Sequence, residues 1–207
     1  MEEQEFYYSS IRGRMLGGKA REHLIDALIR KNAGESFIEV GCGAGHYVKK
    51  AFSMFSLCAG VDLRLGKLFL ARGKTGCDNF ANADAEFLPF KNSSFDFVLC
   101  TEMLEHVPQW KKALAELRRI AGKKILLSIP LEHGFFWKAF SLFYGMDTRG
   151  HLHKLDRKKI ESQMKGWKLR EFSLVCTPSR RLNKRIGNRA GERGSMYAVM
   201  LFGKGGK

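Results

Sequence analysis

The sequence contains no apolar run that approaches the roughly 20 residues of a membrane-spanning helix. Its first ten residues, MEEQEFYYSS, are acidic, and they include neither the basic start nor the apolar core of a secretory signal. We therefore expect a cytoplasmic protein without a transmembrane segment. Peripheral contact with a membrane remains open, because a basic protein is attracted to anionic lipid.

Paired cysteine motifs are also absent. The five cysteines form no CxxC pair and are odd in number, and most lie in apolar stretches. Such thiols pack as small apolar side chains, which favours a reducing compartment over a disulfide framework. The nearest approach to a metal motif is the pair His151 and His153, which has no third ligand at a recognised spacing, so no metal is predicted.

No internal repeat or low-complexity linker interrupts the 207 residues, so we expect one domain with a substantial core. What the chain has in excess is positive charge: 36 Lys and Arg residues against 21 Asp and Glu give a net charge of +15. Such an excess favours acidic partners, such as nucleic acid, an anionic small molecule or an anionic membrane surface. The alternative interpretation is a solvated basic surface that binds no particular partner.

Strand and helix patterns alternate along the chain, which predicts an α/β sheet with helices on both faces. Five strand–helix units precede a terminal strand pair. One helix is expected to open at Pro108 and end before Gly122, and another to be capped by Asp156 and stopped by Gly166. The predicted strands are SFIEV, LCAGVDL, NFANAD, SFDFVLCTE, KKILLSIP, KLREFSLVCTPS and SMYAVMLFGK.

A glycine-rich turn follows the first predicted strand, in the stretch FIEVGCGAGHYVKK. Gly41, Gly43 and Gly45 have no side chains, so a ligand can approach the backbone amides closely. A dinucleotide-binding loop needs Gly or Ala at the position that His46 occupies. The spacing therefore disfavours NAD, although a nicotinamide-dependent oxidoreductase remains an alternative.

Acidic residues lie at or near the ends of three successive predicted strands: Glu39, Asp62 and Asp84. Ligands of open α/β sheets bind at this carboxyl edge, where a carboxylate about 20 residues beyond the turn can hold a ribose. For Asp62 alone, a helix cap is the alternative. Together the three acids are suited to an amine, a ribose and an adenine amino group.

These features resemble those of class I S-adenosylmethionine-dependent methyltransferases, and the chain is similar to the ubiquinone/menaquinone-type (type 11) subgroup. The resemblance covers about residues 36–130. It is carried by FIEVGCGAGHY, GVDL, NADAEFLPFKNSSFDFVLCTEMLEHV and KKILLSIP, in the order of the family.

The resemblance implies a Rossmann-like, doubly wound sheet of seven strands, in the order 3-2-1-4-5-7-6 with the last strand antiparallel. It implies a single methyltransferase domain over residues 1–207. Within it we expect an N-terminal helical segment (1–35), a cofactor-binding core (36–130), a lid or substrate region (131–166) and a terminal strand pair with a basic loop (167–207).

The implied cofactor is S-adenosylmethionine, with S-adenosylhomocysteine as product. By resemblance, Glu39 and the glycine turn hold the methionine part, Asp62 the ribose, and Asp84 with Ala85 the adenine. The full set of implied cofactor-binding residues is Glu39, Gly41, Cys42, Gly43, Gly45, His46, Tyr47, Asp62, Leu63, Asp84, Ala85, Glu86, Thr101, Glu102 and Met103.

His106, in the family-like stretch LEHV, is the candidate general base, because imidazole titrates near physiological pH. The alternative is a histidine that only packs beside the cofactor. An aromatic helix face is expected in 134–146, as a lid or membrane contact, and 177–195 forms a basic loop. The substrate-side candidates are Tyr7, Tyr8, His151, Arg180 and Arg181.

Missing motifs narrow the methyl acceptor. No Asn/Asp-Pro-Pro-Tyr/Phe motif follows the fourth strand, which disfavours exocyclic base amines, and no Pro-Cys pair supports carbon-5 pyrimidine methylation. We expect transfer to an O, N or C nucleophile of a small or amphipathic anionic substrate. The alternatives are an RNA substrate (tRNA or rRNA) and a non-catalytic S-adenosylmethionine-binding module. The oligomeric state is not predicted.

Overall fold

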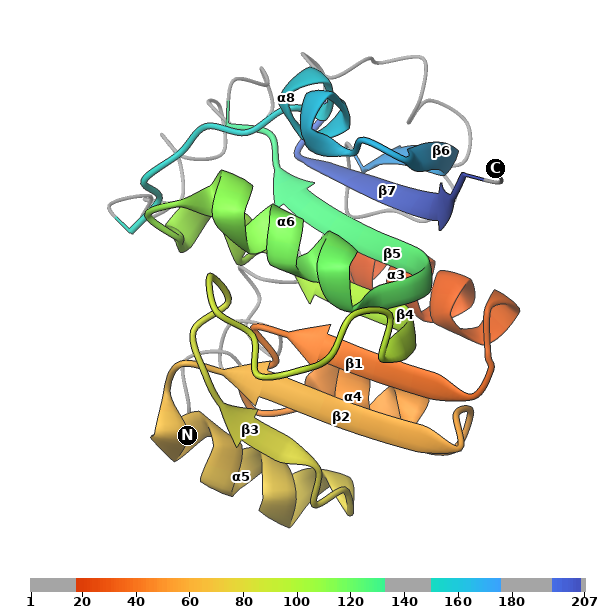
Figure 1. The fold of residues 1–207 in the computed structure, drawn as a ribbon, viewed down its shortest axis with the longest axis vertical. Coiled ribbons are helices and arrows are strands. Elements are labelled where there is room, and N and C mark those ends of the chain that lie inside the picture. The colour runs from red at the N-terminus through yellow and green to blue at the C-terminus, as the bar shows by residue number, and fades with distance from the viewer. Residues whose placement is uncertain (1–17, 133–149, 176–194, 206–207) are drawn as a thin grey trace.

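Seven strands form one mixed sheet in the order β3-β2-β1-β4-β5-β7-β6 (Figure 1). The computed structural model describes residues 18–132, 150–175 and 195–205. Strands β1 to β5 pair in parallel, whereas β7 is antiparallel to both β5 and β6, as predicted. The strands are β1 (Ser36–Val40), β2 (Leu57–Asp62), β3 (Phe80–Asn82), β4 (Phe95–Thr101), β5 (Ala121–Pro130), β6 (Trp167–Val175) and β7 (Tyr197–Lys204).

Helices cover both faces of the sheet. Figure 1 shows α6 in front of the sheet and α3 and α4 behind it. The helices are α3 (Gly18–Lys31), α4 (His46–Ala51), α5 (Leu65–Thr75), η1 (Leu104–His106), α6 (Trp110–Ile120) and α8 (Arg157–Gln163). One buried cluster joins the sheet to α6 and α8, and the other joins it to α3, α4 and α5. The apolar runs of the central strands follow from this double cover.

Helix α6 departs from the predicted boundaries at both ends. Pro108 lies outside the helix, which begins at Trp110 after Gln109. At the other end Ala121 is already extended and pairs with Phe95, so β5 follows α6 without a loop. Gly122 therefore lies inside β5, and its prediction as a helix cap was wrong because strand pairing begins one residue earlier.

The predicted boundary of α8 is confirmed at its start. The side chain of Asp156 accepts a hydrogen bond of 2.8 Å from the amide of Lys159, as an N-cap does. Gly166 has a positive φ of 80° and precedes β6. The helix itself ends at Gln163, so Gly166 belongs to the turn that joins α8 to β6.

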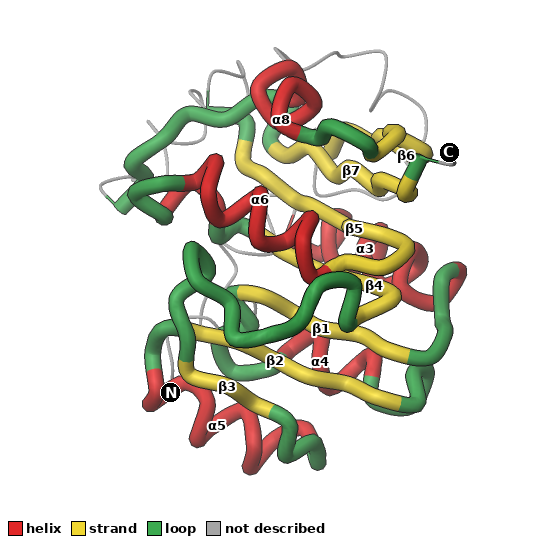
Figure 2. The backbone as a smooth tube through the Cα atoms, in the orientation of Figure 1, coloured by secondary structure: helices red, strands yellow, loops and turns green. Residues whose placement is uncertain are grey.

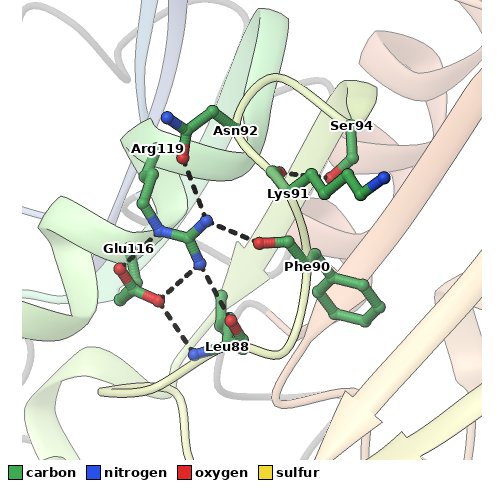
Figure 3. Close-up of polar contacts among 7 residues, drawn as sticks. All are labelled: Leu88, Phe90, Lys91, Asn92, Ser94, Glu116 and Arg119. Atoms are coloured by element: carbon green, nitrogen blue, oxygen red, sulfur yellow. Dashed lines mark hydrogen bonds and ion pairs between the residues drawn. The ribbon is translucent and has the colours of Figure 1, made fainter.

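The connection from β3 to β4 is a long loop without a helix (Figure 2). Arg119 of α6 anchors it by donating hydrogen bonds to the carbonyl oxygens of Leu88 and Phe90 (Figure 3). Glu116 pairs with Arg119 and accepts the Leu88 amide at 2.9 Å. Asp84 lies on this loop, so α6 helps to set its position.

Several sequence expectations concern other parts of the chain. Within the described ranges, no helix combines the length and the apolarity that a membrane span requires. The expected aromatic helix face of 134–146 and the basic loop of 177–195 lie almost wholly outside the described residues. The four-part division of the domain stays a prediction.

Candidate active site

The glycine turn joins β1 to α4, and all three of its glycines have positive φ angles: 77° at Gly41, 51° at Gly43 and 78° at Gly45. Such angles are costly for residues with a Cβ atom. Close packing adds a second requirement. A Cβ atom at Gly41 would lie 2.7 Å from Cγ of Met103, and one at Gly45 would lie 2.7 Å from Cγ2 of Thr75. These two glycines are thus needed by the fold itself.

Four amides of the turn donate hydrogen bonds within the protein. The amides of Gly41 and Cys42 both donate to the carbonyl oxygen of Val61, at 2.8 and 2.9 Å. The amide of Gly45 donates to the carbonyl oxygen of Cys42 at 2.9 Å. The amide of Gly43 donates to Oδ2 of Asp62 at 2.8 Å. A pyrophosphate site depends on backbone N–H groups that point at the ligand. The internal use of these four amides therefore favours a cofactor without phosphates.

Asp62, the last residue of β2, links the glycine turn to the start of α5. It is 7% exposed, and while Oδ2 accepts the Gly43 amide, Oδ1 accepts the amide of Arg64 at 2.9 Å. The latter bond is that of an Asx turn and not the helix cap considered from the sequence, because the N-cap position of α5 is Arg64. An ionised carboxylate has about four acceptor positions, so Asp62 can bond a ligand hydroxyl as well.

Glu39 is buried in β1 beside this aspartate. Its Oε2 accepts the amide of Val48 at 3.3 Å, and the side chain is 3% exposed. Burial raises the pKa of Glu39 well above its usual range, and the nearby charge of Asp62 raises it further. Two buried carboxyl groups side by side favour a cationic ligand, because a positive charge offsets both their repulsion and their desolvation.

The residues after β3 and β2 form the outer part of this edge. Oδ1 of Asp84 accepts the amide of Glu86 at 2.8 Å. The Glu86 side chain is buried, and it accepts the amide of Gln109 at 2.9 Å, which ties the loop to the start of α6. Leu63 is 69% exposed and offers apolar surface next to Asp62. An adenine contact for this region stays a prediction.

The residues after β4 approach the glycine turn from the other side. Thr101 ends the strand, and Met103 packs against Gly41. Glu102 has a φ of 48°, which is rare for a residue with a side chain. Its carboxylate pairs with Arg21 of α3, a fully buried guanidinium, and accepts the hydroxyl of Ser128 at 3.2 Å. The Glu102 side chain thus fastens α3 to this edge.

Three further predicted cofactor residues have side chains engaged elsewhere in the fold, two of them buried and the exposed His46 in a contact with α3. Cys42 and Tyr47 are buried in the cluster that faces α3, α4 and α5. His46 Nε2 lies 3.0 Å from Oε1 of Glu22, so the residue that replaces a small one in the turn binds α4 to α3. Any cofactor contact of these residues through the backbone stays a prediction.

His106 lies in η1, directly after this edge. Its Nδ1 is 2.9 Å from the carbonyl oxygen of Gly150. A carbonyl only accepts, so Nδ1 carries the proton and Nε2 is the basic nitrogen of the neutral ring. Burial lowers the pKa of His106 below its usual value, as does the neighbouring charge of His151. A ring that is neutral at physiological pH suits the predicted role of proton acceptor.

His151 packs against His106, with ring centroids 4.6 Å apart and planes at 82°. Its Nδ1 contacts Oε1 of Glu132, which follows β5. His153 lies apart from this pair: its Nε2 is 3.0 Å from the carbonyl oxygen of Pro108. The structure therefore brings one of the two neighbouring histidines to the site.

His153 instead lines a groove of about 370 Å³ between the start of α6 and α8. None of the residues of the glycine turn lines this groove. Its lining residues are Trp110, Lys111, Leu152, His153, Lys154, Leu155, Lys159, Ser162 and Gln163.

Glu105 was not among the site residues predicted from the sequence. This residue is 1% exposed, and neither carboxylate oxygen has a hydrogen-bond partner among the described residues. Burial raises the pKa of Glu105 to about 8. Its carbonyl oxygen accepts the amides of Leu152 and His153, at 2.8 and 3.2 Å, and so holds the segment around His151 against η1. The available signal was an acid directly after the apolar pair Met103 and Leu104.

The other substrate-side candidates, Tyr7, Tyr8, Arg180 and Arg181, lie outside the described residues. Their assignment to the substrate side stays a prediction.

Comparison with known proteins finds methyltransferases among the proteins similar to this chain. Residues 38–125 match the family model of the methyltransferase domain, type 11. The chain is 36% identical over 87 residues to the uncharacterized protein MJ0638 of Methanocaldococcus jannaschii, covering 42% of this chain and 36% of that protein. It is 31% identical over 100 residues to the ubiquinone biosynthesis O-methyltransferase of Hahella chejuensis, covering 42% of this chain and 39% of that enzyme.

Among solved structures, the fold is similar to that of magnesium protoporphyrin IX methyltransferase from Synechocystis PCC 6803 with bound SAH. The TM-score is 0.71 at 14% identity, covering 97% of this chain and 92% of that one. The chain spans between 33% and 55% of the length of the first curated relatives that it matches. Residues 38–125 therefore carry the methyltransferase domain of type 11, and the strand order is that of class I S-adenosylmethionine-dependent methyltransferases.

Proposed function

We propose that the protein transfers a methyl group from S-adenosylmethionine to an O, N or C nucleophile of a small or amphipathic anionic molecule. The observation that carries this proposal is the pair of buried acids, Glu39 and Asp62, beside a glycine turn that has four of its amides bonded internally. An acidic site without an array of free amides suits a cationic cofactor. It disfavours a dinucleotide, which carries two phosphates.

The residues present fit S-adenosylmethionine, whose ammonium and sulfonium groups are both positive. Glu39 and the glycine turn would hold the methionine part, Asp62 the ribose, and the Asp84 loop the adenine. When bound, the cofactor supplies a methyl group on positively charged sulfur, which is already strongly electrophilic. The chain's own part is then to align the acceptor and to exclude water, with Nε2 of His106 placed to receive a proton.

The net charge of +15 supports an anionic acceptor. The names of two similar proteins, a ubiquinone biosynthesis O-methyltransferase and a magnesium protoporphyrin IX methyltransferase, support a small molecule over RNA. Arg180 and Arg181 are the proposed substrate-side cations, and the reducing cytoplasm is the proposed location.

A thermal-shift titration tests the cofactor assignment. S-adenosylhomocysteine should raise the melting temperature in proportion to ln(1 + [L]/Kd), whereas NADH should leave it unchanged. Stabilisation by NADH alone would exclude S-adenosylmethionine as the cofactor.

The acceptor is tested separately, by transfer of labelled methyl groups into a cell extract with and without ribonuclease. We expect label in a small-molecule fraction that ribonuclease does not change. Loss of the label after ribonuclease would assign RNA as the acceptor. The absence of label in every fraction would assign the protein as a binding module.

A further inference from the structure

Three side chains with metal-ligand atoms converge directly after β4. The ligand atoms of Glu105, His106 and His151 all lie within 4.8 Å of one another. Metal–ligand bonds of about 2.0–2.2 Å place ligands of a tetrahedral site about 3–4 Å apart. The side chains therefore need to move by only about 1 Å to share one ion.

Backbone contacts hold the two segments of this cluster together. Glu105 and His106 belong to η1, whereas His151 comes from the segment that begins at Gly150. The carbonyl oxygen of Glu105 accepts the amide of Leu152 at 2.8 Å, and Nδ1 of His106 lies 2.9 Å from the carbonyl oxygen of Gly150. The main-chain bond thus brings the two segments together, and the contact with Gly150 holds the exposed ring of His106 in place.

No other residue among those described forms a hydrogen bond with the carboxyl group of Glu105. It is 1% exposed, and both of its oxygens lack a hydrogen-bond partner among the described residues. The buried cation that acts on it electrostatically, Arg21, is paired with Glu102. A buried carboxylate is costly unless a cation or a metal ion compensates its charge. A bound cation at this cluster would supply that compensation.

The two imidazoles have the outer contacts that are typical of metal-binding histidines. In such sites the second ring nitrogen usually donates to a carboxylate or a carbonyl group, which fixes the tautomer and the ring orientation. Nδ1 of His151 contacts the carboxylate of Glu132, and Nδ1 of His106 contacts the carbonyl of Gly150. This arrangement assigns Nε2 of each ring to the metal.

We propose that Glu105, His106 and His151 bind one divalent first-row transition-metal ion, such as Zn²⁺ or Mn²⁺. Two imidazole nitrogens and one carboxylate form a ligand set that suits these ions better than Mg²⁺ or Ca²⁺, which prefer oxygen ligands. The sequence predicted no metal, because the pair that it offered was His151 with His153. In the structure, the residues that lie beside His151 are Glu105 and His106 of η1, and His153 lies outside the cluster.

Three protein ligands leave coordination positions for another molecule. Two of the three ligands follow Met103, which packs on the glycine turn, so the ion would lie near the edge of the sheet that carries the proposed cofactor residues. On the basis of the proposed function, we infer that an acceptor with an oxygen donor occupies these positions. His106 then acts as a ligand in place of a proton acceptor.

The metal site is tested without the cofactor. Full-length protein, freed of any affinity tag and stripped with EDTA, is titrated with Zn²⁺ and Mn²⁺ by calorimetry and with Co²⁺ by visible absorption. We expect about one ion per chain and a rise in melting temperature, with at least tenfold weaker binding of Mg²⁺ and Ca²⁺. Failure to bind any transition-metal ion would overturn the proposal.

Point variants locate the ion. Glu105→Gln and His151→Gln should each lower the affinity at least tenfold and change the Co²⁺ spectrum. His153→Gln is the matched control, because His153 is a neighbouring histidine outside the cluster, and it should bind as the wild type does. An unchanged affinity in Glu105→Gln, or an equal loss in His153→Gln, would show that the ion binds elsewhere.

Methyl transfer with and without EDTA separates this proposal from the proposed function. Transfer that stops with EDTA and returns with Zn²⁺ or Mn²⁺ supports both proposals. Metal binding without methyl transfer supports the site and counts against the methyltransferase activity. Methyl transfer at full rate in EDTA would leave the methyltransferase activity standing and overturn the catalytic part of the metal proposal.

Discussion

The Oδ2 atom of Asp62 accepts a hydrogen bond of 2.8 Å from the backbone amide of Gly43. This contact joins the end of β2 to the turn between β1 and α4, and the register of the two strands brings these ends together. A residue proposed to hold the ribose is therefore also part of the scaffold. Substitutions at Asp62 will change stability and cofactor affinity together.

Asp62→Ala removes the acceptors of the Gly43 and Arg64 amides. We expect a loss of about 1–3 kcal/mol in the free energy of unfolding, because a buried amide is left without a partner. Affinity for S-adenosylhomocysteine should fall at least tenfold. Denaturant titration and calorimetry measure the two effects. Asp78→Asn, at an exposed position before β3, is the control and should change neither. Unaltered cofactor affinity in Asp62→Ala would remove Asp62 from the site.

Gly41→Ala places a methyl group 2.7 Å from Met103 on a backbone with φ near 77°. Strain and overpacking should together lower the free energy of unfolding by about 1–3 kcal/mol. Gly73→Ala is the matched substitution in α5, where a Cβ atom meets nothing within 4 Å. It should raise stability by about 0.5–1 kcal/mol, because alanine is the better helix residue. Equal effects of the two variants would contradict this account of the turn.

Glu22 joins α3 to α4 through His46 and Lys50, at 3.0 and 2.5 Å. The hydrogen bond to His46 is the chief cause that lowers the pKa of Glu22 from 4.5 to about 2. A depressed pKa contributes stability that is present above pH 4.5 and is lost as the pH falls toward 2. Since these ion pairs are partly exposed, we expect a contribution of about 1 kcal/mol.

Denaturant unfolding at pH 7 and pH 3 checks this prediction. Glu22→Gln should reduce the loss of stability between the two pH values by about 1 kcal/mol relative to the wild type. Glu35→Gln, at an exposed position before β1, should leave the loss as it is in the wild type. A wild-type pH dependence in Glu22→Gln would show that Glu22 does not contribute to acid sensitivity.

Arg119→Ala removes the hydrogen bonds that hold the β3–β4 loop on α6 (Figure 3). Stability should fall by about 1–3 kcal/mol, because carbonyl oxygens of the loop lose a charged donor. Amide hydrogen exchange should quicken around Asp84, and affinity for S-adenosylhomocysteine should fall with it. Lys123→Ala, in which an exposed ion pair with Asp96 is lost, should change stability by less than about 0.5 kcal/mol. An unchanged rate of amide hydrogen exchange near Asp84 in Arg119→Ala would show that Arg119 does not hold the part of the loop that carries Asp84.

Local sequence patterns were enough to predict the alternation of strands and helices, and the family resemblance gave the strand order. Glu39 and Asp62 lie where that order brings the strand ends together, and their contact with a cofactor stays a prediction. The boundary of α6 was less predictable. Pro108 and Gly122 are typical helix-end residues, but pairing of β5 with β4 from Ala121 onward overrides them.

Contacts between distant segments could not be read from spacing. Glu105 is buried and His151 lies beside His106 only because the chain returns to η1 after β5. The internal hydrogen bonds of the glycine turn were equally hidden, since the same glycine spacing serves turns that leave their amides free. Sequence patterns show which residues have the chemical groups to bind a ligand. Tertiary packing decides which of these groups already have a partner within the protein.

Arg21 connects three parts of the chain that are far apart in the sequence. This fully buried guanidinium pairs with Glu102 after β4, and it lies 4.5 Å above the ring of Tyr197 in β7. The segment recognised by similarity, 38–125, contains neither α3 nor β7. A fragment cut to that segment would lose Arg21 and Tyr197 and would leave Glu102 without its buried cationic partner. The smallest unit that keeps these contacts therefore begins before α3 and continues through β7, well beyond the segment recognised by similarity.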